Sequence, residues 1–213
     1  MKNLIFILIF LSFSFTALCQ GGVNFEQLTF DEALSKAKAE NKLVFMDCYT
    51  TWCAPCKYMA DNVFPREEAG EFFNPKFVSV KFDMENGEGK ELAQKFGVRA
   101  YPTFLIIRPD GSVQHRIVGG VNLDKFIEIA ERGLNVKTSF DYLDRLHEKG
   151  KMNKKQLISY QIALNDAYEE EKSNKVAQEL KSILKEKDKM QKEYWPILSI
   201  STLTLGQPYC FFL

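Results

Sequence analysis

Residues 42–57 read KLVFMDCYTTWCAPCK, and this stretch decides how the chain is expected to fold. The apolar run 42–46 is typical of a central strand that is buried on both faces. Cys53 and Cys56 follow, with two residues between them, where a helix to about Asp61 is expected to begin. The stretch therefore predicts a pair of cysteines between a buried strand and a helix.

That position gives the two thiols different chemistry. The amino terminus of a helix carries partial positive charge from its unpaired amide groups, so it favours a thiolate and lowers the pKa of the first cysteine, Cys53. Helical geometry brings Cys56 within bonding distance of it. Cys53 can then attack a disulfide in another protein, and Cys56 can resolve the mixed disulfide. Trp52 would shield the pair and offer an apolar surface to a peptide.

Two other uses of a close cysteine pair stay open at this point. The first is half of a zinc site, but zinc requires four ligands, and the two histidines, His115 and His147, are single and far apart. The second is a disulfide with a purely structural role, which small loops of this kind can carry. Redox chemistry is favoured over both, with no bound metal, because one close pair among scattered single cysteines fits it better.

The sequence around the pair predicts an α/β domain. A capping box at Thr29 and Glu32 predicts the start of a helix, and Gly97 predicts the end of another. Residues 109–111, Pro-Asp-Gly, predict a turn between two paired strands. Early alternation followed by a late hairpin implies a mixed central sheet with helices on both faces. The expected helices are 29–40, 53–61, 65–73, 88–96 and 122–134, and the expected strands are 42–46, 77–82, 103–107 and 112–118.

The chain is expected to divide into four parts. The α/β domain should cover 20–135, after a leader at 1–19. Residues 136–198 are rich in Lys, Glu and Gln, and their apolar spacing predicts amphipathic helices in a hairpin array or small bundle. Residues 199–213 form an apolar tail, for which an edge strand, a docked tail and an abrupt end to a longer design all stay open.

The first nineteen residues resemble a secretory signal peptide. The basic Lys2 precedes the apolar run 4–11, and the small residues Ala17 and Cys19 suit cleavage after Cys19. The apolar run is shorter than the ~20 residues that span a bilayer comfortably. We therefore expect an exported protein, periplasmic or secreted, that contacts a membrane only if the signal stays uncleaved or Cys19 is lipidated.

The amino-acid composition limits the classes of partner that the chain is expected to bind. The chain has 28 basic and 28 acidic residues with neither sign dominating a stretch, which argues against nucleic acid or an anionic membrane as the partner. Few cysteines remain after the leader, so the chain is not a disulfide-dense scaffold. Cys48 should point to the sheet face opposite Asp47 as a buried core cysteine, and Cys210 is a single.

The run Trp52 to Lys57 resembles the active-site motif of the thioredoxin superfamily, and especially of its exported bacterial members. Further matching features lie in the same order between Phe25 and Asn135. The resemblance implies a thioredoxin fold, here with a C-terminal α-helical extension. It also implies a thiol–disulfide oxidoreductase with a redox-active disulfide between Cys53 and Cys56 and no soluble cofactor.

Thioredoxins keep a buried acid at the position of Asp47, and the resemblance implies that it exchanges protons with Cys56. The physical argument agrees, because a carboxyl without a partner in an apolar strand should have a raised pKa and could act as acid or base near neutrality. An exposed Asp at the end of the strand is the alternative. Lys81 matches a lysine that thioredoxins often place near this acid, although a solvated strand-end lysine fits nearly as well.

The resemblance also implies a groove for substrates. Thioredoxins place a cis proline opposite the cysteine pair, here Pro102 after Tyr101, and backbone groups beside it bind extended substrates. A trans proline at the start of a strand is the alternative. Trp52, Pro55 and Gly119 would line the same groove. Ala54-Pro55 resembles the reducing thioredoxins, but Tyr101 is bulkier than the family's usual residue, so the direction of electron flow stays open.

Together these features predict an exported oxidoreductase that reduces or isomerises disulfides in envelope proteins. Its partners would be the thiols and disulfides of exported proteins and a membrane thiol electron donor. The competing hypothesis is a partner-binding or redox-sensing module in which the helices of 136–198 hold a client and the thioredoxin-like domain has a secondary role.

Overall fold

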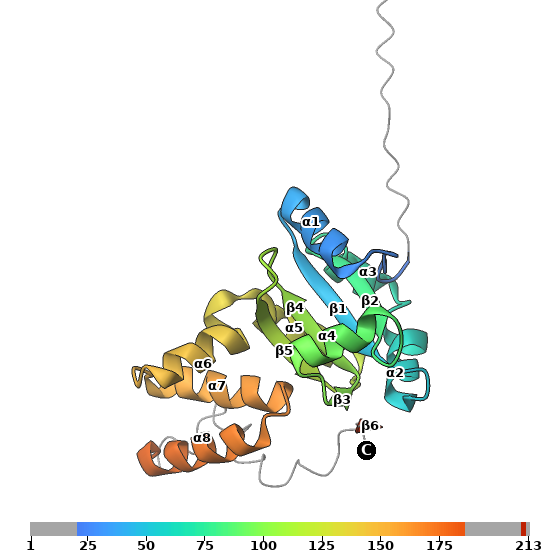
Figure 1. Cartoon of the computed structure of the whole chain (residues 1–213). Coiled ribbons are helices and arrows are strands. Elements are labelled where there is room, and N and C mark those ends of the chain that lie inside the picture. The colour runs from blue at the N-terminus through green and yellow to red at the C-terminus, as the bar shows by residue number, and fades with distance from the viewer. Residues whose placement is uncertain (1–20, 186–209, 212–213) are drawn as a thin grey trace, which may run out of the picture.

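The structure is a computed structural model that describes residues 21–185 and 210–211 of the 213-residue chain. A four-stranded sheet in the order β2-β1-β4-β5 lies at its centre (Figure 1). β1 runs parallel to β2, whereas β4 is antiparallel to both of its neighbours, so the predicted mixed sheet is confirmed. The strands are β1 (Leu43–Tyr49), β2 (Phe77–Asp83), β4 (Thr103–Ile107) and β5 (Val113–Val118).

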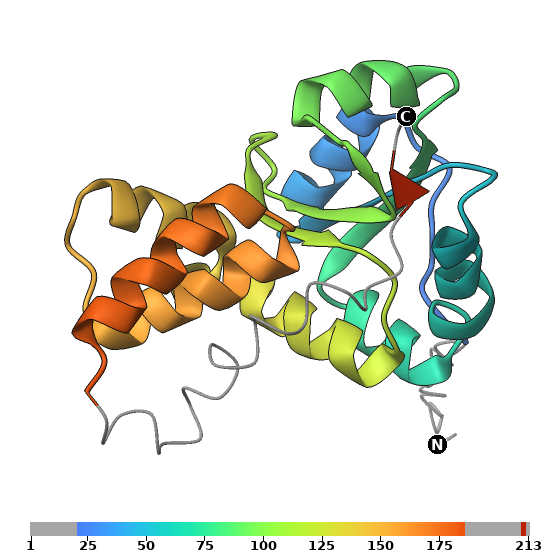
Figure 2. The ribbon, with the colours of Figure 1, turned by 90° about the horizontal axis from the view of Figure 1, so that it is seen from below.

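Helices cover both faces of this sheet, as Figure 2 shows. α1 (Phe30–Glu40) and α4 (Glu88–Phe96) pack on one face, where Ala33 and Leu92 join the strand residues Val44 and Met46 in one apolar cluster. The predicted capping box begins α1, since the Thr29 hydroxyl accepts from the Glu32 amide and the Glu32 carboxylate accepts from the Thr29 amide. Gly97 ends α4 in the left-handed conformation, with φ 58°, as predicted.

The opposite face carries η1 (Met59–Val63), α3 (Glu67–Phe73) and α5 (Leu123–Leu134). α2 (Ala54–Tyr58) leads directly into η1, and its Cys56 belongs to the first cluster. Phe45 lies at the centre of its aromatic core, with ring centroids 4.7 Å from Phe73 and 5.8 Å from Phe104. The predicted helix 53–61 ends slightly later, because α2 continues as a π-helical turn to Val63. That turn buries both Met59 and Val63 against the sheet.

A second, smaller sheet lies outside the main one. β3 (Ala100–Tyr101) pairs antiparallel with β6 (Cys210–Phe211), near the carboxyl end of the chain. β3 runs directly into Pro102 and then β4, so the small sheet lies beside the point where β4 of the main sheet begins. The predicted apolar tail thus contributes one short strand, and the rest of 199–213 lies outside the described residues.

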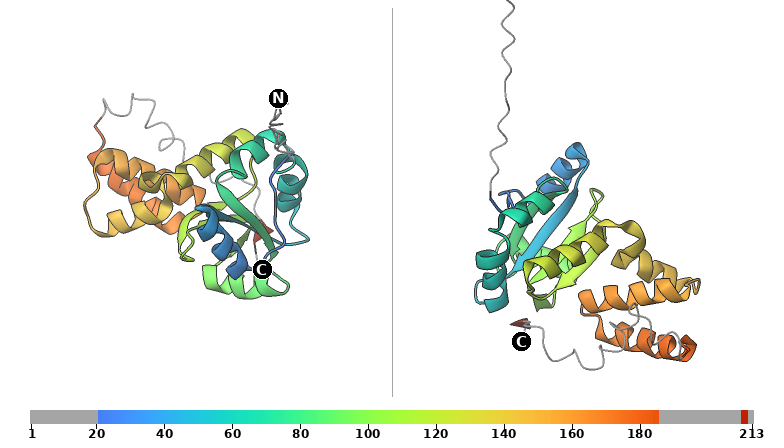
Figure 3. Two further views of the ribbon diagram at one scale, coloured as in Figure 1. Left: turned by 90° about the horizontal axis from the view of Figure 1, so that it is seen from above. Right: turned by 180° about the vertical axis from the view of Figure 1, so that it is seen from behind.

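The predicted helical extension is present, following η2 (Val136–Thr138). Its core consists of apolar residues from α6, α7 and α8, such as Leu143, Leu164 and Leu180. The extension packs against the edge strand β5, away from β2 (Figures 1 and 3). The three helices are α6 (Phe140–Glu148), α7 (Lys154–Asp166) and α8 (Glu170–Ile183).

The predicted signal peptide 1–19 lies outside the described residues, and the division of the chain into four parts stays a prediction. Over the ranges 21–185 and 210–211, none of the helices combines the length and the apolar character needed to cross a membrane.

Candidate active site

Cys53 and Cys56 form a disulfide at the amino end of α2, with their Cα atoms 5.2 Å apart. Cys53 is the capping residue of the helix, and its Sγ accepts a hydrogen bond of 3.2 Å from the Cys56 amide. Pro55 lies in the first turn, where a helix leaves amide groups unpaired, so the proline ring removes no helical hydrogen bond. The local sequence therefore places both sulfurs at the helix terminus.

This placement favours negative charge on Cys53 once the disulfide is reduced. The Cys56 amide already points at the Cys53 sulfur, and hydrogen bonds to a charged acceptor are stronger than those to a neutral one. The positive end of the helix dipole acts in the same direction. The first cysteine is thus the one whose thiolate the fold stabilises.

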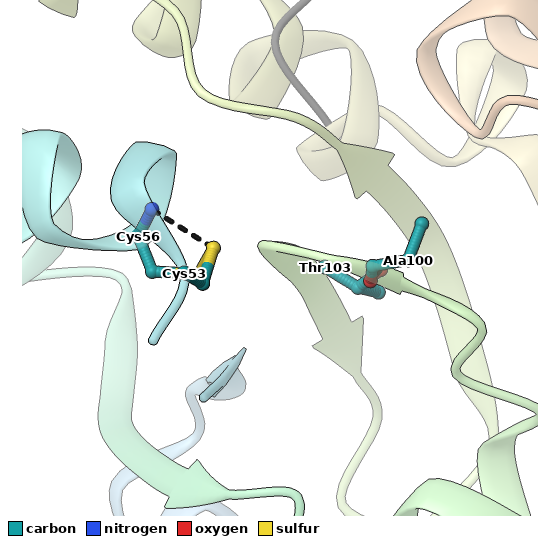
Figure 4. The surroundings of a disulfide bond; sticks show 4 residues. All are labelled: Cys53, Cys56, Ala100 and Thr103. Carbon is teal, nitrogen blue, oxygen red and sulfur yellow. Dashed lines mark hydrogen bonds between the residues drawn. A yellow bond between two sulfur atoms is a disulfide. The ribbon is translucent and has the colours of Figure 1, made fainter. Parts of the chain in front are cut away.

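The bond between Tyr101 and Pro102 is cis, so the trans alternative is wrong. Two hydrogen bonds hold the backbone on either side of the proline. The Thr103 hydroxyl donates to the Ala100 carbonyl at 2.8 Å, and the Gly119 amide donates to the Pro102 carbonyl at 2.8 Å. Figure 4 shows Cys53 facing the segment that carries Ala100 and Thr103. The sheet therefore presents the proline segment to the disulfide.

Aromatic residues form the rim of this site. The Trp52 ring meets the buried Tyr101 ring edge to face, with centroids 6.0 Å apart, while 47% of Trp52 stays exposed. Tyr58, further along α2, is 44% exposed and was not among the predicted site residues. Its exposure depends on how α2 is rotated against the sheet, which the sequence did not specify. The rim offers apolar surface of the kind a peptide can cover.

The two glycines after β5 have separate roles near the pair. Gly119 adopts φ 96°, a conformation that side chains disfavour, and its amide bonds to Pro102. A Cβ on Gly120 would lie 3.2 Å from the Pro55 carbonyl oxygen. Gly120 therefore allows the turn after β5 to approach the active-site helix closely.

Asp47 is buried in β1, so the alternative of an exposed Asp is wrong. It lies between Lys81 of β2 and Phe104 of β4 in the sheet register, and its Oδ1 has no hydrogen-bond partner. Burial raises the pKa of Asp47 to about 7, and the positive charge of Lys81 acts in the opposite direction. The carboxyl can therefore change protonation state near neutral pH.

The neighbouring groups have simpler environments. Cys48 is buried in the apolar cluster on the other face of the sheet, as predicted, and burial raises the pKa of its thiol far above the usual range. Lys81 is exposed, with its Nζ 5.7 Å from the centre of the Phe25 ring. Nowhere in the part of the chain that the structure describes do three His, Cys, Asp or Glu side chains gather to hold a metal ion.

A disulfide that begins a helix and faces a cis-proline segment, with a buried acid in the strand that precedes the helix, defines the site of a thiol–disulfide oxidoreductase. Comparison with known proteins agrees. The family model for a thioredoxin-like domain matches residues 30–134. A rice thioredoxin of the H type is 42% identical over 90 residues, which cover 42% of this chain and 68% of that protein.

Two further similarities come from bacteria. The solved structure of a disulphide-isomerase candidate from Bacteroides thetaiotaomicron is 44% identical, with a TM-score of 0.50, over 54% of this chain and 95% of that one. The thiol:disulfide interchange protein DsbD of Pseudomonas fluorescens is 32% identical over 99 residues, 45% of this chain but only 17% of that protein. This chain belongs to the thioredoxin family, and the family match ends before the helices α6 to α8.

Proposed function

We propose that this protein is an exported enzyme that reduces or isomerises disulfides in envelope proteins through a cycle between the dithiol and disulfide forms of Cys53 and Cys56. The observation that carries the proposal is the disulfide at the start of α2 beside the cis Tyr101–Pro102 bond. Export is supported by the signal-like sequence of residues 1–19.

In the reducing direction, the Cys53 thiolate attacks one sulfur of a client disulfide, and the other client sulfur leaves as a thiolate. A mixed disulfide then joins Cys53 to the client. The Cys56 thiolate attacks the Cys53 sulfur and releases the second client thiolate, which leaves the Cys53–Cys56 disulfide that the structure contains. Two electrons pass from the protein to the client in each turnover.

Asp47 supplies the proton exchange that the second step requires. Cys56 must lose its thiol proton before it can attack, and a carboxyl with a pKa of about 7 can accept that proton at neutral pH. Asp47 lies on the same sheet face as Phe45, which shares an apolar cluster with Met59 of η1, and η1 directly continues the helix that carries Cys56. Asp47 therefore acts as general base in this step and as general acid in its reverse.

The cycle has to be recharged from outside, because each client leaves the pair oxidised. A membrane thiol donor is the class of partner that an exported reductant needs. The similarity of residues in this chain to a part of a thiol:disulfide interchange protein supports a partner of this chemistry. Pro102 and its neighbours would hold clients and donor alike in the groove beside Trp52.

Insulin reduction by the dithiol form tests the activity. The parent should precipitate insulin chains, and Cys53→Ser should lose this activity, whereas Cys48→Ser, which changes a buried cysteine outside the pair, is the matched control. Activity that survives in Cys53→Ser contradicts the proposal.

The equilibrium reduction potential of the Cys53–Cys56 pair shows the direction of electron flow. A value near ~−270 mV indicates a reductant, and one near ~−120 mV indicates an oxidant. Mass spectrometry of the envelope fraction should find Gln20 as the first residue.

A further inference from the structure

The carboxy-terminal strand β6 lies in an unexpected place. It pairs antiparallel with β3, with Phe211 opposite Ala100 and Cys210 opposite Tyr101. We propose that β6 occupies the strand edge that an extended client must use, so that the chain competes with its own clients for the active site. This inference rests on disulfide exchange at Cys53 and Cys56 and is independent of where the protein is located.

The pairing lies directly beside the reactive pair. Tyr101 is the residue before Pro102 and packs against Trp52, which precedes Cys53. Figures 1 and 3 both show β6 beside β3 and close to the start of α2. A segment held on this edge is thus held next to the disulfide.

The edge of β3 admits one partner at a time. Within residues 21–185 and 210–211, β6 is the strand that pairs with β3. The exposed backbone of a short strand binds an extended peptide by the same hydrogen bonds that build a sheet, and these bonds are indifferent to the identity of most side chains. A client that pairs with β3 must therefore displace β6.

A second observation, separate from the pairing of β6 with β3, supports a state in which clients cannot reach the active site: the nucleophile is buried. Cys53 is fully buried and Cys56 is 8% exposed, although the Cys53 sulfur has to reach a sulfur of a client. Disulfide exchange proceeds by direct attack of one sulfur on another, so access to Cys53 is required. The described arrangement must open before it reacts.

The expected size of the competition follows from simple population arithmetic. Two paired residues contribute little binding free energy, but the covalent link to the rest of the chain gives β6 a high local concentration. A client that binds only the open state sees its apparent affinity reduced by the open fraction. If the edge is closed for about nine-tenths of the time, the KM for an extended client rises by about tenfold.

The first test replaces both Cys210 and Phe211 by proline in the full-length chain. Neighbouring strand residues point their amides in opposite directions, so the double substitution removes whichever amide faces β3. The control, Ser201→Pro with Thr202→Pro, places two prolines elsewhere in the apolar tail. We expect the first variant to lower the KM for insulin by about tenfold with kcat little changed, and the control to match the parent. Equal KM values for the two variants overturn the proposal.

The second test traps the docked segment. In Cys56→Ser, the Cys53 thiolate attacks oxidised glutathione and releases one glutathione, and the Cys210 thiolate then displaces the second to form a Cys53–Cys210 disulfide. The control variant also carries Cys210→Ser and Ser201→Cys, which moves the thiol nine positions along the tail. Peptide mass spectrometry should find the bond to Cys210 in several-fold higher yield than the bond formed in the control. Equal yields contradict the strand register.

These outcomes separate the inference from the proposed function. Loss of insulin reduction in Cys53→Ser with no change of KM in the double-proline variant retains the enzyme and rejects the competition. Full activity in Cys53→Ser rejects the proposed function itself.

Discussion

Two enclosed carboxyl groups lie in different regions of the described part of the chain, and their surroundings differ. Asp47, in the active-site region, is 7% exposed, and its Oδ1 accepts no hydrogen bond. Asp166 lies where the helical extension meets the thioredoxin domain, and its side chain is 10% exposed. Its Oδ2 accepts hydrogen bonds from Arg132 of α5, at 2.7 Å from Nη2 and 3.1 Å from Nε.

The contrast shows that two carboxyl groups with similar burial can have different roles, one structural and one in proton transfer. Burial raises the pKa of both groups, but the Arg132 charge beside Asp166 opposes that effect at close range. An acid held by a two-pronged guanidinium is fixed in position, which suits a structural joint. An acid without a donor exchanges its proton readily near neutral pH, which suits the transfer to and from a thiol.

The joint has further direct bonds. The Phe140 amide at the start of α6 donates to His115 Nδ1 of β5 at 3.0 Å, and Arg108 pairs with Asp141 at 2.9 Å. The side chains of the second pair are largely covered. The extension is thus fixed at the β5 edge of the sheet. In the sheet order, β4 separates this edge from β1 and its Asp47.

The largest expected effect comes from breaking the joint. Arg132→Met leaves the Asp166 carboxylate buried without its partner, and losing one partner of a buried pair costs about 3–5 kcal/mol. Urea unfolding should show this loss. The double variant Arg132→Met with Asp166→Leu should recover most of the stability, because no unpaired charge remains. A double variant as unstable as the single one contradicts the assignment of the loss to the unpaired carboxylate.

The second effect has the opposite sign and comes from the active-site acid. The pKa of Asp47 is about 7 in the folded chain against 3.8 for an ordinary aspartate. The folded state therefore holds its proton longer, and stability is lost as the pH rises from about 4 to about 7. Asp47→Asn escapes this loss and should be more stable than the parent by up to about 4 kcal/mol at pH 8.

The comparison in urea should run at pH 4 and pH 8, since the advantage of Asp47→Asn should shrink towards zero at the lower pH. Asp166→Asn is the matched control from the joint, and it should destabilise the chain at pH 8 because it weakens the bond to Arg132. An Asp47→Asn variant without any advantage at pH 8 contradicts the raised pKa.

A third effect tests the joint at acidic pH. Burial lowers the pKa of His115 to about 3 from the usual 6.5, so the unfolded chain takes up a proton that the folded chain refuses. Stability is then lost as the pH falls below 6.5, by about 3 kcal/mol down to pH 4. His115→Asn keeps an acceptor for the Phe140 amide and should lose about that much less on acidification in urea unfolding. Parallel acid profiles for both chains contradict this assignment.

How far the sequence predicted this structure depends on whether the signal was local. The capping box at Thr29, the stop at Gly97 and the cysteine pair before α2 depend on adjacent residues, and all three were found as predicted. The burial of Asp47 was predicted because four apolar residues precede it in one strand. Such patterns can be predicted because the residues that cause the structure are neighbours in the sequence.

Other features depend on contacts between distant segments, and the sequence did not reveal them. Arg132 and Asp166 lie on different helices and are 34 positions apart in the sequence. In the sequence alone, each looks like an ordinary surface charge. The role of His115 depends on an amide 25 positions away. The pairing of β6 with β3 involves a two-residue strand, which is too short for an alternating pattern.

The smallest expected effect concerns the rim of the active site and should lower the free energy of unfolding by no more than about 1 kcal/mol. Trp52→Ala removes an exposed ring whose edge contact with Tyr101 contributes about 1 kcal/mol. If that ring also covers clients, the KM for insulin should rise about fivefold, as about 1 kcal/mol of lost binding implies. Val136→Ala is the control from the joint, since Val136 is also about half exposed and lies beside α6 rather than the disulfide. A rise in KM that is equal in both variants would mean that clients contact the joint as much as the site, and the functional division between the two regions would then be wrong.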